Sequence, residues 1–187
     1  MEFHPTFEKF ARDHAVLPRE DFVQRYRNPL LVIDLVGVDV LPPDFKAYAA
    51  TSQGDHLTAF VDGGKDRTKV LVVEVVKSDR NRFNTMITLG RASSNDIVVP
   101  HQAISKFHAY FQEDDRTGQI TFTDAKSKFG STVNGRPLPP SEPYPLASGA
   151  AIVLGRSVHA TFYSPKDFFA YMQLMERIRK RGDTQRR

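Results

Sequence analysis

Three polar clusters in the middle of the sequence contain residues that can bind a phosphate group. Arg91 follows an apolar, β-prone run, and its planar guanidinium carries several N–H donors that suit a tetrahedral oxyanion. Ser105 adds a hydroxyl and a backbone N–H, and Lys106 and Lys128 add mobile positive charges. The clusters hold no obvious pair of nucleophile and base. We therefore predict a receptor for a phosphorylated ligand, without catalytic residues.

Several of these residues also have a purely structural interpretation. Arg91 could pair with a loop carboxylate such as Asp96, and Ser105 could serve only to form a turn. His108 is expected to be a hydrogen-bonded structural histidine. The six histidines show no metal-ligand spacing, because His101 and His108 have no acidic residue placed to complete a site with them. No metal and no cofactor is expected.

Short β-strands are expected to position these clusters. Turn sequences separate the β-prone runs, and Asn134-Gly135 favours a two-residue hairpin turn because both residues tolerate positive φ. This spacing predicts an all-β fold, an antiparallel sandwich or barrel whose loops gather polar residues at one edge. The expected strands cover residues 70–77, 86–89, 97–99, 108–112, 119–123, 131–133, 151–154 and 157–163.

Five motifs follow one another across this region. They are Ile87-Thr88-Leu89-Gly90-Arg91, Ser94-Asn95-Asp96-Ile97-Val98, Ser105-Lys106-Phe107-His108-Ala109, the segment from Asp124 through Gly130-Ser131 to Val133-Asn134-Gly135, and Ile152-Val153-Leu154-Gly155. Their order and spacing resemble the forkhead-associated (FHA) domain family. A single Gly-Arg or Asn-Gly pair carries little information, but the series as a whole is specific.

The resemblance implies an antiparallel β-sandwich of about eleven strands that binds phosphothreonine peptides and is not an enzyme. By the same resemblance, Arg91 and Ser105 bind the phosphate and Lys106 assists them. The implied partners are phosphothreonine-containing proteins, either substrates of a Ser/Thr kinase or a kinase itself. The residues expected to support the site are Gly90, His108, Asn134 and Gly135.

The loop before Gly130 departs from the family pattern. The family usually has an asparagine at the position of Phe129, and phenylalanine cannot form a hydrogen bond with a peptide backbone. Either the peptide is held differently or the affinity is reduced, and Lys128 could offset part of the loss by reaching the phosphate. Lys128 and Phe129 are therefore candidate peptide-binding residues. An aromatic loop tip also supports an alternative function, a phosphate-independent scaffold that uses the same loops.

The chain is expected to divide into three parts. Residues 1–66 form a mixed α/β extension of unknown role, with two short helices and a buried strand near residues 30–36. Residues 67–163 form the FHA-like domain. Residues 164–187 form a C-terminal amphipathic helix with a basic tail, and Ser164-Pro165-Lys166-Asp167 is a typical helix start.

Composition and charge exclude several classes of function. The chain has 187 residues and no cysteine, which rules out disulfides and thiol catalysis. The net charge of +4 resides in residues 176–187, so the rest is not a polycation and nucleic acid is not an expected partner. Asp34 and Asp39 interrupt the longest apolar stretch, and the start does not resemble a signal peptide. We therefore expect a cytoplasmic protein without a membrane partner; the sequence predicts no oligomeric state.

Overall fold

The computed structural model describes residues 5–35 and 70–184, with side chains up to residue 177. The part of the expected N-terminal extension between residues 36 and 69, and the last residues of the basic tail, lie outside the described residues. Within these ranges, no helix is both long enough and apolar enough to cross a bilayer.

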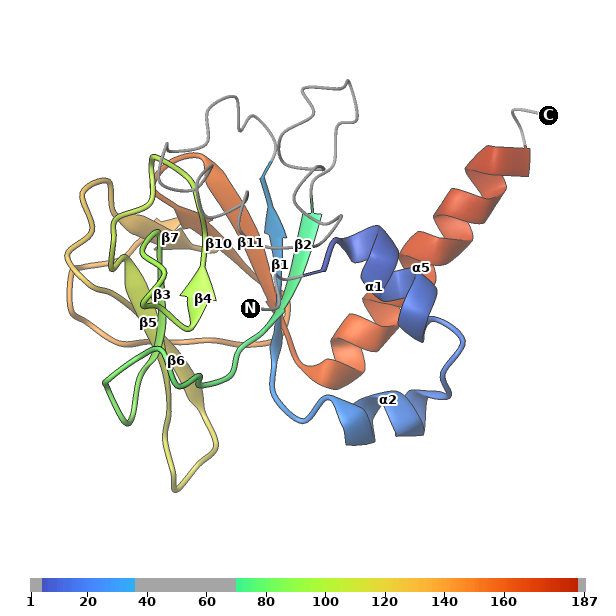
Figure 1. The fold of residues 1–187 in the computed structure, drawn as a ribbon, viewed down its shortest axis with the longest axis horizontal. Coiled ribbons are helices and arrows are strands. Elements are labelled where there is room, and N and C mark those ends of the chain that lie inside the picture. Colours follow the sequence, from blue (N-terminus) through green and yellow to red (C-terminus); the bar gives the residue numbers. More distant parts are fainter. Residues whose placement is uncertain (1–4, 36–69, 185–187) are drawn as a thin grey trace.

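Two β-sheets form the body of the described structure (Figure 1). The strands are β1 Leu30–Asp34, β2 Val70–Glu74, β3 Ile87–Gly90, β4 Ile97–Val98, β5 Ala109–Glu113, β6 Ile120–Asp124, β7 Ser131–Val133, β8 Arg136–Pro137, β9 Tyr144–Pro145, β10 Ala150–Leu154 and β11 Val158–Tyr163. One sheet has the order β2-β1-β11-β10-β7-β8, and the other has the order β4-β3-β5-β6-β9. The prediction of an antiparallel β-sandwich is confirmed, although the short strand β4 runs parallel to β3.

The core between the sheets results from the alternation of side chains along each strand. In β5, Ala109 and Phe111 are buried, while Tyr110 between them is only half-buried. The ring centroid of Phe111 lies 5.0 Å from that of Phe122 in β6 and 6.3 Å from that of Phe162 in β11 of the other sheet. Burial of each such side chain stabilises the fold by about 1.5–3 kcal/mol. This packing fixes the ends of the strands, from which the polar loops begin.

Strand β1 comes from the region expected to be the N-terminal extension, yet it lies inside the six-stranded sheet. It pairs antiparallel with β11 on one side and with β2 on the other. Leu31 and Ile33 enter the core between the sheets, and Leu30 and Val32 pack on the opposite face. Residues 30–34 are therefore part of the sandwich, although the boundary expected from the sequence lies at residue 66.

Three helices cover the outer face of the six-stranded sheet: α1 Phe7–His14, α2 Arg19–Arg25 and α5 Pro165–Thr184 (Figure 1). They lie beside β1 and β2, so that the two ends of the chain share one helical layer. The second apolar cluster, between these helices and the sheet, comprises Phe10, Ala11, Phe22, Leu30, Val32, Val72, Phe168 and Met172. The expected extension thus contributes helices and a strand to the same packed body.

Helix α5 begins where the sequence predicts. The Asp167 N–H donates to Ser164 Oγ at 3.2 Å, and the Ser164 hydroxyl donates to the Asp167 carboxylate at 2.8 Å. This exchange satisfies a backbone donor that has no partner within the helix. Phe168 and Met172 follow at helical spacing and are buried against the sheet.

Candidate functional site

The loops that carry the polar motifs meet at one edge of the sandwich. These are the β3–β4, β4–β5, β6–β7 and β10–β11 loops, which we call the loop edge. The Arg91 N–H donates to Ser105 O at 2.9 Å, and the Gly155 N–H donates to Gly130 O at 3.0 Å. The Lys128 N–H donates to the hydroxyl oxygen of Ser105 at 3.0 Å. Hydrogen bonds therefore bring Arg91, Ser105 and the adjacent Lys106 together with Lys128.

Arg91 keeps most of its guanidinium free of internal partners. Its Nε donates to Ile104 O at 3.1 Å, and its two terminal nitrogens have no hydrogen-bond partner among the described residues. Asp96, with which Arg91 could have paired, faces away from the loop edge and is only 4% exposed. The ion-pair partner of Asp96 in the described part of the chain is Lys77, at 3.7 Å. The guanidinium is thus anchored on one side, and its other donors can bind a ligand.

Ser105 and Lys106 lie in a turn that the protein backbone fixes. The Ser105 hydroxyl accepts from Lys128, which leaves its own proton for donation to a ligand. The Lys106 carbonyl accepts from the Ala92 N–H at 3.1 Å and from the Asn95 side chain at 2.7 Å. The Lys106 side chain is exposed. The turn therefore holds a hydroxyl donor and a mobile ammonium group next to Arg91.

Gly90 allows β3 to lie directly against this turn. A Cβ atom on Gly90 would lie 2.3 Å from Lys106 O and 2.8 Å from the Asn95 side chain. Any other residue would have to push the backbone of the Ser105-Lys106 turn away. The absence of a side chain at Gly90 therefore permits the close approach of β3 to the turn beside Arg91.

His108 links three segments beneath the loop edge. Its ring Nδ1 accepts from the Ser105 backbone N–H at 3.1 Å. Its backbone N–H donates to Leu89 O, and its backbone carbonyl accepts from the Ala125 N–H. Burial lowers the pKa of the His108 ring below its ordinary value of 6.5, and the Asp124 carboxylate and the Gly130 backbone raise it by less. The neutral ring is required here, because a backbone N–H can donate only to an unprotonated Nδ1.

We expect the protein to lose stability as the pH falls below about 6.5. Burial also lowers the pKa of His101. For both rings the unfolded chain binds a proton more readily than the folded chain. The stabilisation is therefore complete above pH 6.5 and declines as the pH falls toward the folded-state pKa. Urea unfolding at intervals from pH 7.5 to 5 measures this effect.

The variant His108→Asn separates the contribution of His108 from that of His101. Asparagine places an acceptor oxygen where Nδ1 lies, and it does not titrate in this range. Its unfolding midpoint should depend less on pH than that of the wild type. An identical pH profile in both proteins would contradict the assignment.

The two carboxylates near the loop edge are turned inward. Asp124 is 1% exposed and accepts hydrogen bonds from the Ser127 N–H, the Ser127 hydroxyl and the Ser131 hydroxyl, at 2.6–2.8 Å. Asp96 likewise accepts hydrogen bonds from the backbone N–H groups of Ser78 and Thr88. The exposed charged side chains on the four loops are all basic: Lys106, Lys126, Lys128 and Arg156. The surface of the loop edge is therefore positively charged.

Phe129 lies on this surface between two cations. Its side chain is 39% exposed, and its ring centroid lies 5.2 Å from Lys128 Nζ and 5.4 Å from the guanidinium carbon of Arg156. The sequence analysis did not select Arg156. The available signal was the order Gly155-Arg156 after a strand, which repeats the order Gly90-Arg91.

Phe107 forms an apolar rim next to Lys106. Its ring stacks against those of Phe83 and Tyr110, with centroid distances of 6.0 Å and 6.1 Å. Phe107 is 36% exposed and Phe83 is 52% exposed. This stack was also missed by the sequence analysis, because its members are separated in the chain and only the structure aligns their rings.

Asn134 and Gly135 form the predicted hairpin turn, with φ values of 50° and 78°. The Asn134 side chain accepts from the Ala151 N–H at 2.9 Å and so attaches the turn to β10. Both residues follow β7, whereas Phe129 and Gly130 precede it. The structure therefore places them apart from the phosphate-binding candidates, at the other end of a strand that leads from the loop edge.

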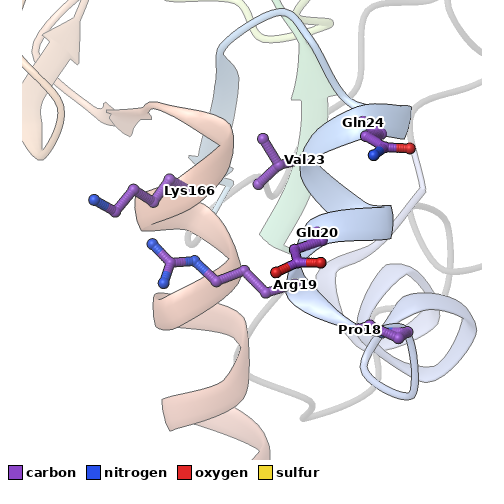
Figure 2. A pocket seen from close by; sticks show the side chains of 6 residues that line it. All are labelled: Pro18, Arg19, Glu20, Val23, Gln24 and Lys166. Carbon is purple, nitrogen blue, oxygen red and sulfur yellow. The ribbon is translucent and has the colours of Figure 1, made fainter.

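An open hollow of about 680 Å³ lies between α2 and α5, in the helical layer (Figure 2). Side chains of both charges line it, and Arg19 and Lys166 extend in the same direction from their two helices. The lining residues are Pro18, Arg19, Glu20, Val23, Gln24 and Lys166. None of them belongs to the four loops, so the hollow is distinct from the candidate phosphate site.

The fold and the position of this site define the class of β-sandwich modules that carry their polar loops at one edge. A family model described as FHA domain matches residues 87–155. The matched segment holds Arg91, Ser105 and Lys128, and it runs from β3 to the end of β10. Residues 87–155 therefore match the FHA domain family, as the motifs predicted. A search of curated proteins finds no match.

Solved structures of FHA domains resemble the chain at low identity. The MEK1 FHA domain in complex with a phosphothreonine peptide of HOP1 is 22% identical, with a TM-score of 0.41, over 50% of this chain and 87% of that one. The yeast Dun1 FHA domain in complex with a doubly phosphorylated Rad53 peptide is 23% identical, with a TM-score of 0.44, over 73% of this chain and 74% of that one.

Proposed function

We propose that this protein binds phosphothreonine-containing peptides at the loop edge and acts in signalling that depends on a Ser/Thr kinase. The observation that carries the proposal is the cluster of Arg91, Ser105 and Lys106 on one surface, with outward donors and no exposed carboxylate among the four loops. A phosphate group carries a charge of about −1.5 to −2 at neutral pH. It therefore matches this surface in both charge and hydrogen-bonding capacity.

Each candidate has a distinct role in this proposal. The terminal nitrogens of Arg91 bind two phosphate oxygens as a fork, and the Ser105 hydroxyl donates to the third. Lys106 and Lys128 add positive charge beside them. Charge-assisted hydrogen bonds contribute about 1.5–3 kcal/mol each, and micromolar binding requires about 8 kcal/mol. Contacts with the peptide backbone and its flanking side chains must supply the remainder, and Phe107 and Phe129 offer exposed surface for them.

Recognition without catalysis is the mode of action that this geometry supports. His108 is a potential base next to Ser105, but its Nδ1 accepts from the Ser105 backbone N–H. The Ser105 hydroxyl oxygen accepts from the Lys128 N–H. A serine nucleophile would instead need its hydroxyl to donate to the base. The hydrogen bonds of Ser105 and His108 therefore shape the turn and do not activate the serine hydroxyl.

Binding to an oriented phosphothreonine peptide library tests the proposal. We expect the folded protein to select phosphorylated peptides over their unphosphorylated copies. A preference for phosphothreonine over phosphoserine of about fourfold would follow from burial of one methyl group. Equal binding of phosphorylated and unphosphorylated peptides would overturn the proposal.

Such an outcome would favour a second candidate function, a phosphate-independent scaffold that uses the same loop edge. The exposed aromatic side chains Phe83, Phe107 and Phe129 support this alternative, because aromatic groups are enriched at protein interfaces. The scaffold function predicts a partner that remains bound after phosphatase treatment. The library experiment separates the two functions, because only phosphopeptide recognition loses binding when the phosphate is removed.

A further inference from the structure

Two cations, Lys128 and Arg156, contact the exposed Phe129 ring in the loop next to the candidate phosphate site. We propose that Arg156 and Lys128 bind a second anionic group on the same phosphopeptide, and this inference rests on the proposed function. The ligand class is therefore a phosphothreonine peptide that carries a flanking carboxylate or a second phosphate. A carboxylate and a phosphate present the same chemistry to an Arg and Lys pair, namely an anion with several acceptor oxygens.

The Phe129 ring organises the two cations. Lys128 Nζ and the Arg156 guanidinium carbon lie 5.2 Å and 5.4 Å from its centroid, within the distance of about 6 Å at which a cation is attracted to an aromatic ring. The same exposed ring therefore attracts both of these long side chains. Side chains positioned in advance lose less conformational freedom when they bind a ligand.

The backbone fixes Arg156 relative to the phosphate site. The Gly155 N–H donates to Gly130 O at 3.0 Å, which joins the β10–β11 turn to the loop of Phe129. Gly155 also lies against the loop of Ser105, since a Cβ atom on it would lie 2.2 Å from Ala103 O. Two neighbouring loops thus hold the turn that carries Arg156.

Charge balance indicates what the pair binds. Neither Lys128 nor Arg156 has a carboxylate at ion-pair distance within the described ranges 5–35 and 70–177. Two like charges near one ring repel each other, and a bound anion would be attracted to both. The Lys128 N–H contacts Ser105 Oγ, so the anion would belong to a peptide residue close to the phosphothreonine.

Fluorescence anisotropy with the full chain and three sets of peptides tests the inference. The first set has a phosphothreonine with neutral flanks, the second adds one aspartate at each flanking position in turn, and the third adds a second phosphate at those positions. A surface ion pair changes an equilibrium by up to about fivefold. Because two cations are involved, we expect the best position to bind between about twofold and twentyfold more tightly than the neutral peptide, with a smaller gain at high salt.

For each variant, the quantity to measure is the ratio of two affinities, that for the best peptide with a second anion and that for the neutral peptide. Arg156→Asn, which keeps a residue that tolerates the φ of 76°, should lower this ratio severalfold. Phe129→Leu removes the ring but no charge, and it should lower the ratio partly. Arg116→Gln is the matched control, because it removes an exposed arginine from the turn at the other end of β5. It should preserve the ratio.

The outcomes distinguish this inference from the proposed function. A gain with aspartate assigns a carboxylate to the second site, and a gain only with a second phosphate assigns a phosphate; both support the inference. Binding that requires Arg91 but gains nothing from a second anion would overturn the inference and leave the proposed function intact. An unchanged ratio in Arg156→Asn would also overturn it. If no phosphothreonine peptide binds, the proposed function fails and the inference fails with it.

Discussion

Replacement of Arg91 by alanine should reduce phosphothreonine-peptide binding by at least about a hundredfold, to below measurable affinity. In the proposed binding mode, the guanidinium supplies two of the charge-assisted hydrogen bonds to the phosphate, each worth about 1.5–3 kcal/mol, and every 1.4 kcal/mol changes the affinity tenfold. The remaining cations at the loop edge lie on mobile side chains and cannot reproduce the planar fork. Titration of a labelled phosphopeptide by anisotropy or calorimetry measures the effect.

Two further variants make this result specific. Arg91→Lys keeps the charge but loses the fork, so it should retain part of the affinity. Arg116→Ala removes a distant exposed arginine and should bind as the wild type does. Arg91 Nε also donates a hydrogen bond to Ile104 O, so the substitution could destabilise the fold. Thermal unfolding of each variant must therefore accompany the titration. A folded Arg91→Ala protein that still binds the phosphopeptide with wild-type affinity would exclude Arg91 from the phosphate site.

Replacement of Asp96 by alanine should lower the free energy of unfolding by about 3–5 kcal/mol. The Asp96 carboxylate accepts from the backbone N–H groups of Ser78 and Thr88, at 2.7 Å each, and from the Asn81 side chain. Burial alone would raise the pKa of Asp96, but these hydrogen bonds outweigh it and leave the pKa below the ordinary value of 3.8. Without the carboxylate, the buried Thr88 donor and the half-buried Ser78 and Asn81 donors lose their partner at once.

Urea unfolding measures this loss, and Asp114→Ala is the matched control. Asp114 also accepts hydrogen bonds from its own turn, namely from Arg116 and Thr117, but it is exposed. Water can replace the lost acceptor there, so Asp114→Ala should be much less destabilising than Asp96→Ala. Equal losses in the two variants would show that the buried network around Asp96 does not stabilise the fold as we infer.

Local sequence patterns were sufficient to predict the strands and turns of the middle region. The alternation of buried and half-buried residues in β5 and the Asn134-Gly135 turn each depend on a few neighbouring residues, so they can be read along the chain. The location of Arg91 and Ser105 at one edge could be predicted for the same reason, since loops of a sandwich collect at its ends.

Features that depend on contacts between distant segments could not be predicted in this way. The apolar run at Leu30–Asp34 suggested a buried strand, but nothing in it specifies β2 and β11 as its neighbours. The position of Arg156 beside Phe129 likewise arises only when the β10–β11 turn is hydrogen-bonded to Gly130. The inward orientation of Asp96 depends on donors from Ser78 and Asn81, which a motif search does not examine.

The central position of β1 determines which part of the chain can fold autonomously. The segment matched by the family model, residues 87–155, contains neither β1, β2 nor β11. A fragment cut at those limits would leave the β11-facing edge of β10 unpaired and would remove Phe162 from its contact with Phe111. The cooperative unit therefore extends at least from Leu30 to Tyr163. Because β1 must find both of its neighbours across long stretches of chain, we expect completion of this sheet to be a high-contact-order step that slows folding.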